Sequence, residues 1–259
     1  MPVDQRDGWT MTFHDEFKGT TLDTTKWVTC YPDMDPRDKG CIHGDELQRY
    51  LPENVIVSDG TVKLRAQKEN YVAPDGEKYK YTSGMITTGK DKWDTTTPAK
   101  FTYQYGYMEM RAKVPHGQGL WSAFWTLPWV KSDPGLWPPE IDVVEILGHN
   151  TAEAYMTYHW RGHAAEPESN GEKWTGPDLS QDFHTYGALW EPSAIRWFIY
   201  GREVRAAFTD DSNIASFPQY LLANLAVGGS WPGAPEATTP FPSDLEIDHI
   251  RVWQKQTDT

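Results

Sequence analysis

Three acidic residues lie within one short apolar stretch of the sequence. Glu140, Asp142 and Glu145 are separated only by isoleucine and valine residues. Acids in a strand with one buried face are not there for solubility, because a buried charge is costly without a partner. Two neighbouring carboxyls can cleave a glycosidic bond, one acting at the anomeric carbon and the other protonating the leaving oxygen. These residues are therefore the candidates for nucleophilic and acid–base chemistry.

The spacing of the three acids requires an irregular strand. Strand side chains alternate between two faces, so Glu140 and Asp142 share a face, whereas Glu145 would lie on the opposite one. One extra residue, a β-bulge at Val143–Val144, would return Glu145 to the face of the other two. Asp142, lying between the glutamates, could then orient a neighbour and raise its pKa by like-charge repulsion. We therefore predict a bulge here and three carboxyls on one face.

Two other interpretations of the acids stay open at this point. The first is a surface strand whose acids face water, which the absence of a lysine or arginine within the stretch disfavours. The second is a calcium site, since three carboxylates can hold this ion. The sequence has no Asp-x-Asp-x-Asp-Gly loop there, and no glycine turn that would wrap a cation.

Short alternating runs of apolar and polar residues surround this stretch. Turn-forming residues break them at intervals of roughly 8–12 residues, and no long segment has the period of an amphipathic helix. Examples are residues 61–66, 107–114 and 194–204, the last a hairpin with glycine in its turn. Residues 245–253 form a closing strand whose alternation is too imperfect to assign its faces. The pattern predicts an all-β fold, one antiparallel β-sandwich spanning residues 1–259 as a single domain.

Charge and hydropathy exclude two classes of protein. The 259 residues include 24 Lys and Arg against 37 Asp and Glu, a net charge of −13. A basic nucleic-acid-binding surface is therefore not expected. No apolar run reaches the roughly 18 residues of a membrane span. No basic segment followed by an apolar one opens the sequence given, so it shows no signal peptide.

The numbers of aromatic residues and cysteines exclude further classes of protein. The 13 Trp, 13 Tyr and 9 Phe exclude a disordered chain, and so many indoles suggest a surface on which sugar rings stack. Cys30 and Cys41 are too few for a disulfide scaffold or a cysteine-built zinc site. They could form one bridge in an oxidising compartment or remain two free thiols, and the sequence leaves both open.

Six segments of the sequence carry a resemblance to a known family. In chain order they are FHDEF at 13–17, YGYMEMR at 105–111, GQGLWSAFWTLP at 117–128, EIDVVE at 140–145, FHTYG at 183–187 and NLAVGGSWPG at 224–233. Together they resemble glycoside hydrolase family 16, in its bacterial laminarinase-like branch with a bulged active-site strand. The resemblance implies a β-jelly-roll sandwich with a concave cleft, and retaining endo-hydrolysis of β-1,3-glucan. It makes Glu140 the nucleophile, Asp142 the assisting acid and Glu145 the acid/base.

The same resemblance implies a set of binding residues. Trp121 and Trp125 share the parity of one apparent strand, and by pattern alone both indoles could equally be core. The family places aromatic platforms beside the scissile bond, which favours a binding role. The implied substrate-binding residues are Trp121, Trp125, His159, Asn54, Asn224 and Trp231. The resemblance also implies a structural calcium ion on the convex face, held by Glu16, Gly60 and Asp248, and the alternative that Glu16 and Asp248 are ordinary surface acids stays open.

The leading hypothesis is thus an endo-1,3-β-glucanase that needs no organic cofactor. A neutral glucan suits a chain with this negative charge. The alternatives are an agarase or mixed-linkage glucanase of the same family, a transglycosylase, and a glycan-binding protein without catalysis. The presence of both glutamates argues against the last of these. Because polysaccharides lie outside cells, we expect secretion, and nothing in the sequence suggests other than a monomer.

Overall fold

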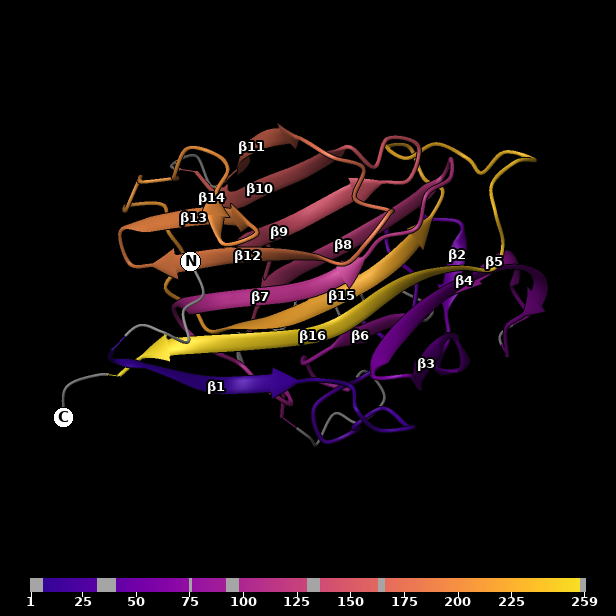
Figure 1. Cartoon of the computed structure of the whole chain (residues 1–259), viewed down its shortest axis with the longest axis horizontal. Helices are drawn as coiled ribbons and strands as arrows, with labels where there is room; N and C mark the ends of the chain where they lie inside the picture. Colours follow the sequence, from indigo (N-terminus) through magenta and orange to yellow (C-terminus); the bar gives the residue numbers. More distant parts are fainter. Residues whose placement is uncertain are drawn as a thin grey trace.

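The computed structural model describes residues 7–31, 41–74, 76–91, 98–129, 136–162 and 166–256. Within these ranges the chain forms two β-sheets lying face to face, and the only helical element is a 3-10 turn, η2 (Pro52–Asn54) (Figure 1). All strand pairs are antiparallel except the short parallel pair β2–β5. The predicted antiparallel sandwich is confirmed. None of the described residues forms a helix that is long and apolar enough to cross a membrane.

The larger sheet runs in the order β14-β13-β12-β7-β16-β4-β5-β2, with β1 also paired to β16 and β3 to β4. Its strands are β1 (Trp9–Asp15), β2 (Gln48–Tyr50), β3 (Val55–Ser58), β4 (Thr61–Val72), β5 (Lys78–Ser83), β7 (Gly106–Lys113), β12 (His184–Glu191), β13 (Ala194–Ile199), β14 (Arg202–Glu203) and β16 (Ser243–Lys255). The smaller sheet runs in the order β11-β10-β9-β8-β15-β6. Its strands are β6 (Met85–Thr87), β8 (Leu120–Pro128), β9 (Glu140–Leu147), β10 (Glu153–Arg161), β11 (Pro167–Thr175) and β15 (Gln219–Val227).

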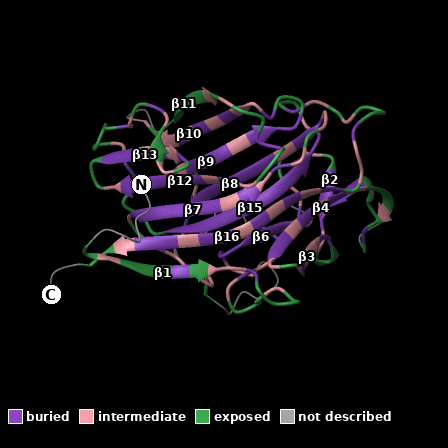
Figure 2. Cartoon of the chain, in the orientation of Figure 1, coloured by how far each residue is buried: buried purple, intermediate pink, exposed green. Residues whose placement is uncertain are grey.

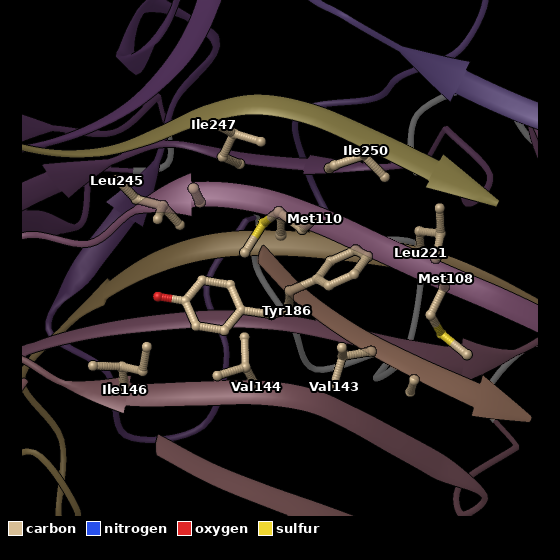
Figure 3. Close-up of a cluster of buried hydrophobic side chains, with 14 of the residues drawn as sticks. Met108, Met110, Val143, Val144, Ile146, Tyr186, Leu221, Leu245, Ile247 and Ile250 are labelled. Atoms are coloured by element: carbon tan, nitrogen blue, oxygen red, sulfur yellow. The ribbon is translucent and has the colours of Figure 1, made fainter. Parts of the chain in front are cut away.

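The main hydrophobic core lies between the two sheets. Inner strands such as β7 and β15 are buried along nearly their whole length, whereas the edge strand β11 is exposed (Figure 2). Apolar residues from β7, β12 and β16 of the larger sheet meet those from β9 and β15 of the smaller one (Figure 3). Removal of this apolar surface from water is the main force that joins the layers. The other face of the smaller sheet is consequently free to carry polar chemistry.

A bulge explains the imperfect alternation of the closing strand. Leu245 and Ile247 have odd numbers and Ile250 and Val252 even ones, yet all four are buried in the same core. The pairing of β16 with β7 shifts register between Ile247 and His249, so Asp248 is an extra residue. An extra residue reverses the parity of everything after it. The strand therefore keeps one apolar face along its whole length.

The hairpin expected at 194–204 is present as β13 and β14. Tyr200 and Gly201 link the two strands, with φ of 53° and 68°. Left-handed conformations at both central residues are typical of the tight turns that match strand twist, and glycine adopts this conformation without strain.

Candidate active site

Strand β9 contains the predicted bulge. On β8, Phe124 pairs with Val144 and the next residue, Trp125, pairs with Asp142, which leaves Val143 without a partner. Both valines point into the core, so two successive side chains face the same way (Figure 3). This is the parity change that the spacing of the acids required, and the predicted bulge at Val143–Val144 is confirmed.

The bulge brings the three acids together in one pocket. Glu140, Asp142 and Glu145 line a cavity of about 330 Å³ on the face of the smaller sheet that points away from the core. The cavity is bounded by β8, β9, β10 and β15, by the segments that flank the disulfide, and by the loop after β15. Its lining residues are Tyr31, His43, Glu46, Trp121, Ala123, Trp125, Glu140, Asp142, Glu145, Thr157, His159, Asn224 and Trp231.

The acids in the pocket hold protons more tightly than free carboxyls do. Burial raises the pKa of Glu140 well above its ordinary value, and the nearby Asp142 raises it further. Burial also raises the pKa of Asp142, to about 7. The pKa of Glu145 is well above its usual range because of burial, with the charges of Asp142 and Glu140 adding to the effect. Carboxyls that stay protonated near neutral pH can act as general acids.

Two side chains favour the ionised form of Glu140. The indole N–H of Trp137 donates a hydrogen bond to Glu140 Oε2 at 2.7 Å. His159 Nε2 lies 3.9 Å from the Glu140 carboxylate and 3.1 Å from that of Asp142. Both Trp137 and His159 lower the pKa of Glu140, against the effect of burial. The site therefore contains groups that stabilise negative charge on this one carboxyl.

Three tryptophans line the walls of the pocket, namely Trp121, Trp125 and Trp231. Trp121 and Trp231 meet edge to face, with ring centroids 5.2 Å apart, and Trp231 is 43% exposed. The indole N–H of Trp125 donates to Asn224 Oδ1 at 2.8 Å, and Asn224 Nδ2 donates to the hydroxyl of Tyr50. Five predicted binding residues therefore border the same pocket as the acids, namely Trp121, Trp125, His159, Asn224 and Trp231.

The chain segment around the disulfide supplies residues that the sequence analysis missed. Cys30 and Cys41 are bridged, which settles the alternative left open above. Tyr31 follows the first cysteine, and His43 and Glu46 follow the second, and all three line the pocket. Burial raises the pKa of Glu46 to about 7. The cysteine pair was the one signal that could have drawn attention to this segment.

Trp137 was also missed as a site residue. It lies in the proline-rich segment before β9, of which residues 130–135 fall outside the described part of the chain. Arg161 donates a hydrogen bond to the carbonyl of Trp137 at 2.6 Å, which fixes the backbone beside Glu140. Only its position three residues before an active-site acid could have marked it.

Asn54 is a correction to the predicted binding set. Its side chain is 1% exposed and does not border the pocket. The amide donates to the carbonyl of Arg65 and to the hydroxyl of Thr82, so it joins β4 to β5. Because these partners occupy its donor group, Asn54 has a structural role rather than contact with a ligand in this pocket.

The residues expected to hold calcium are engaged by cations of the protein itself. Arg251 donates two hydrogen bonds to the carboxylate of Glu16, at 2.8 and 2.7 Å. Asp248 lies 3.3 Å from the guanidinium of Arg111. A calcium ion bound through these carboxylates would have to compete with both arginines. The calcium site stays a prediction.

One further group could hold a cation. Glu140, Asp142 and His159 offer ligand atoms within 4.8 Å of one another, and they are the only such three-residue group among the described residues. These side chains also line the pocket. Their arrangement is accounted for by the hydrogen bond between His159 and Asp142 and by the one between Asp142 and Glu140.

Comparison with known proteins finds relatives along nearly the whole chain. Residues 49–251 match the sequence profile of Glycosyl hydrolases family 16. A glucan endo-1,3-beta-glucosidase A1 of Niallia circulans is 34% identical over 273 residues, covering 96% of this chain and 38% of that protein. A beta-glucanase of Rhodothermus marinus is 33% identical over 274 residues, covering 97% of this chain and 87% of that protein. The chain thus spans well under two thirds of the Niallia protein.

The fold is similar to that of a solved laminarinase. The catalytic domain of an endo-1,3-beta-glucanase (laminarinase) from Thermotoga petrophila RKU-1 superposes with a TM-score of 0.81 at 32% identity. The alignment covers 96% of this chain and 99% of that domain. The two sheets and the pocket face therefore lie within a fold shared over almost the whole chain.

Proposed function

Since this chain belongs to glycoside hydrolase family 16, we propose that it cleaves β-1,3-linked glucan of the laminarin type within the polymer, with retention of anomeric configuration. The observation that carries the proposal is the bulge in β9, which places Glu140, Asp142 and Glu145 on one pocket face. Two carboxyls beside each other, walled by indoles, suit attack on a sugar and protonation of its leaving oxygen.

The proposed mechanism gives each glutamate one role. Glu140 attacks the anomeric carbon and forms a glycosyl–enzyme bond while Glu145 gives its proton to the departing oxygen. Glu145 then takes a proton from water, whose oxygen displaces Glu140 and restores the original configuration. Burial raises the pKa of Glu145 and so favours the protonated form that the first step requires. The Trp137 N–H and His159 favour the anionic Glu140 that the attack requires.

Asp142 supports both steps in this proposal. Asp142 is 3% exposed, its carboxylate lies 3.1 Å from His159 Nε2, and its charge raises the pKa of both glutamates. When it is ionised, it raises the pKa of Glu145 and so helps the acid to keep its proton. When it is protonated, it lacks the charge that repels an ionised Glu140.

The pocket suits a neutral polysaccharide. The exposed face of Trp231 and the indoles of Trp121 and Trp125 offer flat apolar surfaces of the kind on which sugar rings stack. The net charge of −13 would repel an anionic polymer but not a neutral glucan. We further propose that the protein is secreted and acts as a monomer. The Cys30–Cys41 disulfide supports an oxidising compartment.

The test is the release of reducing ends from laminarin, with product anomers followed by proton NMR. We expect release by the wild type with the β-anomer appearing first, and its loss in Glu140→Ser. The matched control is Glu153→Gln, because Glu153 lies on the neighbouring strand β10 but pairs with Lys173 at 2.6 Å outside the pocket. This control should retain full activity.

Other outcomes show whether the proposed substrate, the hydrolytic reaction or the enzymatic activity itself is wrong. Release from agarose or mixed-linkage glucan but not from laminarin would keep the mechanism and change the substrate. Products longer than the starting oligosaccharides would indicate transglycosylation. Binding of laminarin without hydrolysis of any of these polymers would refute the enzymatic proposal.

A further inference from the structure

We propose that Trp197 and Arg205 are positioning residues that hold the β9 bulge from the opposite side of the sandwich, and thereby set the relative placement of Asp142 and Glu145. The inference deepens the proposed function and depends on it only for its kinetic readout. Neither residue borders the pocket or touches a carboxyl of the site. Their effect would pass through the backbone of β9 and β10.

Trp197 bonds to the backbone at the start of the bulge. It lies on β13 of the larger sheet, and its side chain is 0% exposed. Its indole N–H crosses the core and donates to the carbonyl oxygen of Asp142 at 2.8 Å. Asp142 directly precedes Val143, the extra residue of β9. A bulge interrupts the regular ladder, so the carbonyl beside it benefits from a donor outside the sheet.

Arg205 bonds to the backbone on the other side of the same bulge. On β10, Tyr155 pairs with Glu145 and Thr157 with Asp142, which leaves Met156 opposite the bulged residues. Arg205 Nη1 donates to the carbonyl oxygen of Met156 at 2.7 Å. A second bond, at 3.2 Å, goes to the carbonyl of Asn170 on β11. The guanidinium thus ties the strand facing the bulge to the strand beyond it.

The two residues also hold each other in place. The guanidinium carbon of Arg205 lies 4.1 Å from the centroid of the Trp197 ring, in a cation–π contact. Arg205 is only 7% exposed, so its orientation is fixed by these partners rather than by water. One rigid pair therefore bonds to both strands at the point where their register shifts.

The contacts of Trp197 and Arg205 affect the directions in which the side chains of Asp142 and Glu145 point. The parity change at the bulge is what puts Glu145 on the face of Asp142, so any relaxation of β9 there moves one carboxyl relative to the other. Catalysis is sensitive to such movements, since a displacement of about 1 Å can cost roughly 100-fold in rate. Trp197 and Arg205 would thus affect the chemical step without contacting the substrate.

The chain offers a matched control for plain core packing. Trp190 on β12 is also 0% exposed, and its indole N–H also donates to a backbone carbonyl, that of Ala215 at 3.1 Å. Neither Trp190 nor Ala215 borders the pocket. Trp197→Phe and Trp190→Phe remove the same group from equally buried sites. A purely structural role for Trp197 predicts that the two variants behave alike.

The experiment compares these variants by steady-state kinetics on laminarin and by carboxyl titration in the free protein, using carbon-13-labelled glutamate. We expect Trp197→Phe to lower kcat about 10- to 100-fold with KM changed less than about twofold. The titration midpoints of Glu140 and Glu145 should move. Trp190→Phe should leave kcat and both midpoints unchanged.

Arg205 provides a second, independent arm if Trp197→Phe folds poorly. Arg205→Met removes every donor, whereas Arg205→Lys retains a cation and one donor, so kcat should fall in the first and recover in part in the second. The inference would be overturned if kcat and the titration midpoints of Glu140 and Glu145 were the same in Trp197→Phe, Trp190→Phe and the wild type. It would also be overturned if Arg205→Met kept the wild-type midpoints. Should the wild type prove inactive on laminarin, the proposed function fails, and the titrations still decide the inference.

Discussion

Replacing Asp142 with asparagine should stabilise the folded protein at alkaline pH while it impairs catalysis. Asp142 is 3% exposed, and burial raises its pKa from 3.8 to about 7. At pH values between these two pKa values, Asp142 keeps its proton in the folded state and has lost it in the unfolded chain. The free energy of unfolding contributed by this group therefore falls as pH rises from about 4 to about 7, and it stays low above that range.

The size of the effect follows from the same two values. A rise in pKa from 3.8 to about 7 corresponds to a destabilisation of about 4 kcal/mol at pH 8. Asparagine has nearly the same shape and can still hydrogen-bond His159, which lies 3.1 Å from the Asp142 carboxylate. We expect Asp142→Asn to raise the free energy of unfolding by about 2–4 kcal/mol at pH 8 and by under about 1 kcal/mol at pH 4.

The assay is urea-induced unfolding of the wild type and variant at pH 4, 6 and 8. The control is Asp178→Asn, because hydrogen bonds from Thr151 and Ser180 hold the pKa of Asp178 below its ordinary value. Asp178 therefore stabilises the fold above about pH 4, and that contribution is lost as pH falls further. The two variants should differ from wild type in opposite directions at pH 8. A gain for Asp142→Asn that is equal at pH 4 and pH 8, or a loss at pH 8, would refute the reasoning.

Three further predictions concern the pocket and its border. Trp137→Phe removes the N–H that lowers the pKa of Glu140, so the acid limb of the kcat/KM profile should move to higher pH. Replacing Cys30 and Cys41 together with serine should lower the free energy of unfolding by about 3 kcal/mol, as expected for a disulfide of this loop length. It should also raise KM more than it lowers kcat, because Tyr31, which follows Cys30, and His43, which lies shortly after Cys41, border the pocket. Trp231→Ala should raise KM for laminarin about 5- to 50-fold with kcat within twofold, since its exposed indole offers contact area but no proton.

Each of these three predictions would be contradicted by a specific result. An acid limb that stays in place in Trp137→Phe would mean that its hydrogen bond does not affect the essential ionisation. An unchanged unfolding midpoint in the double serine variant would mean that the disulfide does not stabilise the fold. A fall in kcat rather than a rise in KM for Trp231→Ala would assign that indole to the chemical step.

The bulge in the active-site strand β9 was predictable because the spacing of its acids does not fit the regular alternation of strand side chains. Alternation has a period of two, so an odd offset between Glu140 and Glu145 demands an extra residue if both line one site. The same reasoning applied to β16 would have found its bulge, since Leu245 and Ile247 are followed by Ile250 with a change of parity. The local alternation of residues was therefore sufficient to predict the bulges in both β9 and β16.

The rest of the pocket was not predictable by these means. Tyr31, His43 and Glu46 reach the site through the disulfide segment and its packing against β8 and β15, contacts between parts of the chain far apart in sequence. Asn54 shows the opposite error, because a polar residue suited to bind a sugar was needed inside the fold to join two strands. Nothing in the local sequence separates these two uses of a polar side chain.

The place of β16 also constrains the order in which the chain can fold. This strand comes last in the described sequence, yet it lies between β7 and β4 and also carries β1, whose Trp9 pairs with Lys255. While the chain is being synthesised, β1, β4 and β7 must wait for the strand that joins them. Sheets closed by such distant pairs form slowly, and their unpaired edges can bind other chains meanwhile. Refolding yield should therefore fall steeply with protein concentration, and the larger sheet should form as one late, cooperative event.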